Sequence, residues 1–192
     1  MLFAVLLPLG LFLFPLWNIT LEAPQYPTPL GMNIHINDFS DAHPHDIKNI
    51  NLMNHYVGMK YIPDAIPEFK IFPLGIIITS IIGLFIAFKG NYKWFLAWFI
   101  MMVVLSAAGL YDFYLWEHDY GHNLDPKAIM KFTNPDGTVM GFQPPLFGTR
   151  NILNFTAHSY PRLGAYFLGL GIAMSLLAYF KGKKERRVLL KT

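Results

Sequence analysis

Six side chains that can bind a metal or exchange a proton are concentrated in residues 111–125, YDFYLWEHDYGHNLD. If the helix of the preceding apolar run continues outward, three of them share a face, because they are spaced by seven and three residues. His118 and His122 also form a pair four residues apart, the helical spacing used for transition metals. The six residues are Asp112, Glu117, His118, Asp119, His122 and Asp125, and the three on one face are Asp112, Asp119 and His122.

A second group of metal-binding residue types lies earlier, in the sequence MNHYVGM of residues 53–59. Monovalent copper accepts thioether and imidazole ligands, and His55 and Met59 share a face if this segment is helical. The sequence therefore predicts a copper site at which the two segments meet. Its expected ligands are His55, Met59, His118, His122, Asp119 and Asp112, with Met53, Glu117, His43 and His45 as further candidates.

Plainer interpretations of both segments stay open. Methionines are common apolar contacts of an amphipathic helix, which would explain Met53 and Met59 without a metal. The acids and imidazoles of residues 117–122 would equally form a hydrogen-bonded cap at a membrane surface, with Trp116 in the aromatic belt at the lipid headgroups.

Composition indicates a membrane protein. Of the 192 residues, 54% are hydrophobic and only 14% are charged, and the mean hydropathy is +0.35, far from the profile of a soluble domain. The absence of cysteine excludes disulfides, thiolate metal sites and cysteine nucleophiles. A pI near 9.0 does not indicate nucleic acid here, because the basic residues are concentrated beside the apolar runs.

The apolar runs predict an all-α integral membrane protein with four transmembrane helices in one domain, residues 1–192. The spans are expected at residues 2–18, 71–88, 94–111 and 163–180, since each is long or nearly long enough to cross a bilayer. Outer segments 19–70 and 112–162 are expected to be mainly irregular, with short interfacial helices near residues 44–60 and 151–160. Small residues every four positions predict close helix packing; they are Gly75, Thr79, Gly83 and Ala87, and Ala165, Gly169 and Ala173.

The distribution of charge predicts that both termini are cytoplasmic. Basic residues are dense in the loop between the second and third spans and in the tail 181–192, as the positive-inside rule requires. They are Lys89, Lys93, Lys181, Lys183, Lys184, Arg186, Arg187 and Lys191. All seven histidines then fall in the outer segments, which argues against a haem held inside the bundle.

Several long strings in residues 15–130 resemble NosB-type polytopic membrane proteins, which are encoded beside clade II nitrous oxide reductases. The strings are APQYPTPLGMNI, DIKNINLMNHYVGMKYIP, PEFKIFP and YDFYLWEHDYGHNLDPKA. The resemblance implies a bacterial inner-membrane protein with its functional face in the periplasm, serving a copper enzyme that reduces nitrous oxide. It supplies no role for any single residue.

These observations favour a non-catalytic accessory of a respiratory reductase, because no nucleophile with its base and no nucleotide-binding motif is present. The first hypothesis is transient copper binding at the outer face. The alternatives are a docking or electron-transfer subunit that links the quinol pool to the reductase, and a scaffold without a cofactor. Expected partners are the lipid bilayer, nitrous oxide reductase or its maturation and electron-donor proteins, and other membrane subunits packed on the small-residue stripes.

Overall fold

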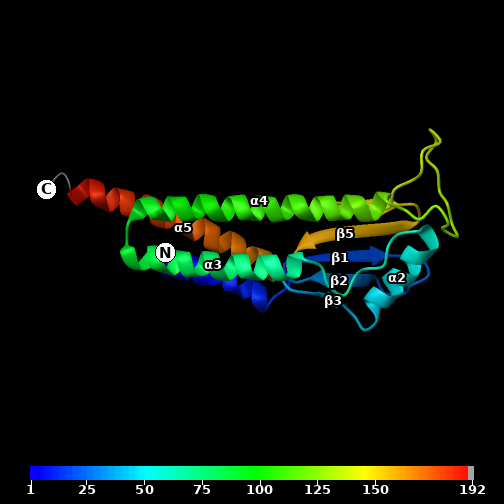
Figure 1. The fold of residues 1–192 in the computed structure, drawn as a ribbon, viewed down its shortest axis with the longest axis horizontal. Coiled ribbons are helices and arrows are strands. Elements are labelled where there is room, and N and C mark those ends of the chain that lie inside the picture. The colour runs from blue at the N-terminus through cyan, green and yellow to red at the C-terminus, as the bar shows by residue number, and fades with distance from the viewer. Residues whose placement is uncertain (190–192) are drawn as a thin grey trace.

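The structure, a computed structural model, describes residues 1–189 and consists of a helical bundle joined end to end with a five-stranded antiparallel sheet (Figure 1). The bundle contains α1 (Leu2–Leu6), the 3₁₀ helix η1 (Leu7–Phe12), α3 (Glu68–Lys89), the first two thirds of α4 (Tyr92–His122) and α5 (Leu163–Leu189). The strands are β1 (Trp17–Glu22), β2 (Leu30–Ile34), β3 (Phe39–Asp41), β4 (Gly148–Ile152) and β5 (Phe155–Pro161), in the order β3-β2-β1-β5-β4.

Three of the helices, α3, α4 and α5, are long and apolar enough to cross a membrane. They contain the runs 71–88, 94–111 and 163–180 that the sequence predicts. The prediction of a fourth span at residues 2–18 is wrong. The 3₁₀ helix η1 begins at Leu7, directly before Pro8, and ends at Phe12. Helices α1 and η1 together therefore measure only about 20 Å, against the roughly 30 Å of a bilayer core.

The all-α fold class is also wrong, because the outer segments pair into a sheet. Strand β1 lies in the middle and pairs with β2 and β5, which bring together residues from the two ends of the chain. The prediction of an interfacial helix near residues 151–160 is wrong, because these residues belong to the hairpin of β4 and β5. The helix expected near residues 44–60 is present as α2 (Asp46–Val57), but it packs on the sheet.

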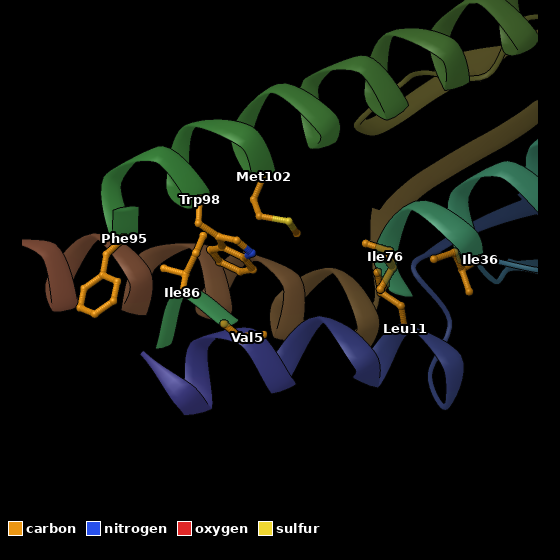
Figure 2. Packing of buried hydrophobic residues seen from close by; sticks show 8 residues of the cluster. All are labelled: Val5, Leu11, Ile36, Ile76, Ile86, Phe95, Trp98 and Met102. Atoms are coloured by element: carbon orange, nitrogen blue, oxygen red, sulfur yellow. The ribbon is translucent and has the colours of Figure 1, made fainter. Parts of the chain in front are cut away.

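The bundle core is built around Trp98, which is almost fully buried and points from α4 toward α1 and α3 (Figure 2). Its indole Nε1 donates to the carbonyl oxygen of Thr79 at 2.9 Å. Gly83 makes this approach feasible, because a Cβ there would lie 2.6 Å from the same indole nitrogen and 2.8 Å from Val5. Within the predicted small-residue stripe on α3, Gly83 therefore allows the close contact with Trp98 and Val5. No described atom lies within 4 Å of a Cβ added at Gly75.

On α5 the close contacts are made by other small residues than the sequence predicts. A Cβ at Gly164 or Gly171 would lie within 3 Å of backbone oxygens of the N-terminal segment. Gly169, from the predicted stripe, has no such neighbour in the described chain. The N-terminal segment thus packs along α5 without spanning the bundle length.

The sheet has one apolar and one polar face, because its strands alternate. Trp17, Ile19 and Leu21 point to one side of β1, and the intervening Asn18, Thr20 and Glu22 point to the other. The apolar face is covered by α2 and by the end of α4, which runs beyond the bundle and over the sheet (Figure 1). We call the strands, α2 and residues 112–147 the sheet unit.

Candidate functional site

The last third of α4 forms one wall of the sheet unit. At about 1.5 Å per residue, the run 94–111 measures about 27 Å, close to the roughly 30 Å thickness of a hydrocarbon core. The three turns that follow face the sheet with Trp116, Glu117 and Tyr120, and both Glu117 and Tyr120 are buried there. The helix thus carries a carboxyl and a phenol out of the bundle and onto an apolar sheet face.

Helix α2 forms the opposite wall and is fixed at both ends by hydrogen bonds. The Asp46 carboxylate accepts hydrogen bonds from the backbone N–H groups of Gly31 (2.7 Å) and His43 (3.0 Å). At the other end Gly58 takes a left-handed conformation with φ of 80°, which glycine adopts without strain. The N–H of Met59 then donates to the carbonyl of Asn54 at 2.9 Å.

The segment after α4 closes the unit by joining both walls. Asp125 N–H donates to the carbonyl of Gly58 (2.8 Å), and Met130 N–H donates to that of Tyr56 (2.9 Å). Phe142 N–H donates to the carbonyl of Gly121 at 2.8 Å. Within this segment the sequence Asn-Pro-Asp-Gly of residues 134–137 forms a turn, since Gly137 N–H donates to the Asn134 carbonyl at 2.9 Å and Thr133 and Val139 form a bridge.

A cavity of about 190 Å³ lies between these walls, and its lining is almost entirely apolar. Glu117 is one of the lining residues and its side chain is 0% exposed. Neither carboxylate oxygen has a hydrogen-bond partner among residues 1–189, and the same holds for the Tyr120 hydroxyl. Burial raises the pKa of Glu117 to about 8 and raises the pKa of Tyr120 as well, because an apolar environment disfavours the charged forms.

The two segments predicted to form a copper site do meet, but their imidazoles lie outside the contact. His118 and His122 are exposed and stack on each other, with ring centroids 4.3 Å apart. His122 Nδ1 donates to the His118 carbonyl at 3.0 Å. His55, also exposed, stacks on Tyr61.

The predicted acidic ligands have other roles. Asp119 accepts a hydrogen bond from Lys60 Nζ at 2.7 Å, and this contact, with a second from Asn123, lowers the pKa of Asp119. Asp112 lies seven residues before it, about 10 Å nearer the bundle along the helix. No three His, Asp or Glu side chains in the part of the chain described, residues 1–189, are grouped so that they could hold a metal.

The remaining candidates divide between the cavity and the surface. Met53 and Met59 line the cavity together with Met32 and Met130, and Met53 Sδ also accepts from Gln25 Nε2 at 3.4 Å. His43 is exposed beside the Asp46 carboxylate, and His45 is the residue that precedes α2, with φ of 71°. The predicted candidates that line the cavity are therefore Met53, Met59 and Glu117, and Tyr120 lines it beside them.

Sequence reasoning assigned Glu117 a minor place and missed Tyr120 altogether. One signal was available: Phe113, Trp116 and Tyr120 recur at helical spacing and mark an apolar face on which Glu117 also lies. An acid on that face is expected to be buried.

Comparison of the chain with protein-family models, with curated proteins and with solved structures gives no match.

Proposed function

We propose that this chain is a multi-pass protein of a bacterial inner membrane whose sheet unit lies on the periplasmic side and binds a small ligand in support of a partner enzyme. The orientation is supported by seven basic residues at the bundle end remote from the sheet, where α3 joins α4 and α5 ends (Figure 1). Positive charge at short loops favours the cytoplasmic side. The residues are Lys89, Lys93, Lys181, Lys183, Lys184, Arg186 and Arg187.

The observation that carries ligand binding is the unpaired carboxyl of Glu117 in the wall of the cavity. A buried polar group without a partner destabilises a fold by about 1–3 kcal/mol, so native proteins rarely contain one without a role. An apolar cavity with few polar groups is also the usual form of a small-molecule site. The group has no neighbouring nucleophile or cofactor motif in residues 1–189, which favours binding over catalysis.

The partner proposed from the resemblance is nitrous oxide reductase, or a protein that matures it or donates electrons to it. The test is nitrous oxide reduction by cells that carry variants of this chain. Ala157→Phe fills the cavity from β5, and Thr156→Phe places the same side chain on the opposite, polar face of that strand. We expect a lower rate only for Ala157→Phe, at equal protein level in the membrane. Equal rates for the two variants would contradict a role for the cavity.

Copper transfer is the second candidate function, because four methionines line the cavity and thioethers bind monovalent copper. Titration of the purified protein with Cu(I) tests it. If the methionines are the ligands, Met53→Leu/Met59→Leu should lose binding and His118→Ala/His122→Ala should retain it. If only His118→Ala/His122→Ala loses Cu(I) binding, the copper site is the histidine pair on the surface of α4.

A further inference from the structure

The lining of the cavity restricts the charge of what it can hold. Its titratable residues within the described chain are Tyr56, Glu117 and Tyr120, and no Lys, Arg or His side chain is among them. An anion would therefore find no positive partner there, and transfer of an unpaired charge into an apolar site is costly. A cation would have one carboxylate partner, at the desolvation cost of a buried ion pair.

The size and shape of the lining favour a flat, rigid molecule. A cavity of about 150 Å³ lined by aliphatic and aromatic side chains is enough to hold benzene, and this one measures about 190 Å³. Trp116, Tyr120, Phe142 and Phe155 supply aromatic surface, to which rings bind face to face or edge to face. One or two fused rings therefore fit.

Two buried polar groups of the lining have no hydrogen-bond partner among residues 1–189, the Glu117 carboxyl and the Tyr120 hydroxyl, and the carboxyl, with two oxygens, has the larger unmet requirement. A protonated carboxyl can donate one hydrogen bond and accept others, and both oxygens lack a protein partner among residues 1–189. A ligand hydroxyl or carbonyl would satisfy this group in a site where an unmade hydrogen bond is expensive. A purely apolar ligand would leave it unsatisfied.

We propose that the cavity binds a small uncharged ring compound that carries a hydroxyl or carbonyl group, with this group hydrogen-bonded to the carboxyl of Glu117. The inference rests on the proposed ligand-binding function and names its ligand class. Affinity comes from the apolar walls, and selection comes from one buried hydrogen bond.

The test compares three probes of similar size by calorimetry on the detergent-solubilised full chain, with empty micelles subtracted. The probes are 2-naphthol, naphthalene and the 2-naphthylmethylammonium cation. We expect one saturable site that takes 2-naphthol about tenfold more tightly than naphthalene, the effect of one buried hydrogen bond. In Glu117→Leu this preference should disappear, and in Glu117→Gln, which can still donate and accept, it should persist.

Tightest binding of the ammonium probe, or a naphthol preference that survives Glu117→Leu, would overturn the inference. Absence of naphthol binding with intact Cu(I) binding would overturn it and leave the ligand-binding function in place. If neither naphthol nor Cu(I) binds and Ala157→Phe has no effect on nitrous oxide reduction, both the ligand class and the proposed ligand-binding function are overturned.

Discussion

The buried carboxyl of Glu117 should make the stability of the protein decrease as the pH rises. Burial raises its pKa from an ordinary value of 4.5 to about 8 in the folded protein. Between these pH values the folded protein keeps a proton that the unfolded chain has lost. The free energy of unfolding therefore falls as pH rises from 4.5, and levels off above about 8.

The size of the effect follows from the two pKa values. At 1.36 kcal/mol per pH unit, the interval from 4.5 to about 8 corresponds to roughly 5 kcal/mol. For a chain of this length that is a shift in melting temperature of about 10–20 °C. Glu117→Gln keeps the size of the side chain and cannot ionise, so the variant should match the wild type at about pH 3.5 and exceed it by this amount at about pH 9.

The assay is thermal unfolding followed by tryptophan fluorescence in one detergent across this pH range. Other titrating groups are common to both proteins, so the difference between wild type and Glu117→Gln isolates the carboxyl. Asp119→Asn is a matched control on the same helix. Its exposed carboxyl has a lowered pKa through the contact with Lys60, so the stability that this carboxylate contributes is lost only in acid. The difference between wild type and Asp119→Asn should therefore stay constant from about pH 5 to about pH 9. Parallel melting curves for wild type and Glu117→Gln up to pH 9 would refute the reasoning.

Three further predictions concern packing and surface charge. Gly83→Ala should destabilise the bundle by about 1–3 kcal/mol, because the new Cβ meets a buried indole at 2.6 Å; Gly75→Ala, earlier on the same stripe and in open space, should not lower the melting temperature. Gly121→Ala should detach the segment after α4, since its Cβ would lie 2.5 Å from a backbone atom of that segment, and limited proteolysis should then cut near residues 133–141; Gly109→Ala, with its nearest neighbour at 3.9 Å, is the control. Lys60→Met should cost no more than about 1 kcal/mol, because its ion pair is half exposed, and a larger loss in 1 M salt than in dilute buffer would contradict this.

The sequence predicted those elements whose signal is local. The runs of α3, α4 and α5 are apolar over a full membrane thickness, and α2 shows a helical period with a glycine at its end. The contact between MNHYVGM and the end of α4 was also expected. What could not be anticipated was which side chains the contact would bury, because this depends on the rotation of both helices about their axes.

The sheet was missed because its pairing is not local. Trp17 of β1 donates a hydrogen bond to Ser159 of β5, 142 positions away, and no short segment reveals such a partner. The strands did carry a signal, since WNITLE alternates between apolar and polar residues throughout and FTAH does so at the start of β5. Because Trp17 directly follows a long apolar run, the sequence instead predicts that it belongs to a membrane span, although the helical structure ends at Phe12, before Pro15.

At Glu117 the local rules of this fold disagree. Its helix, its face and its neighbours all favour an apolar side chain, and a leucine of similar size would fill the same wall without an unmade hydrogen bond. Natural sequences are consistent with their folds except at sites where function requires otherwise. The exposed imidazoles on the same helix meet no such conflict, because water satisfies them. The conflict at Glu117, and not the number of metal-binding residue types around it, is therefore the stronger indication of where this protein acts.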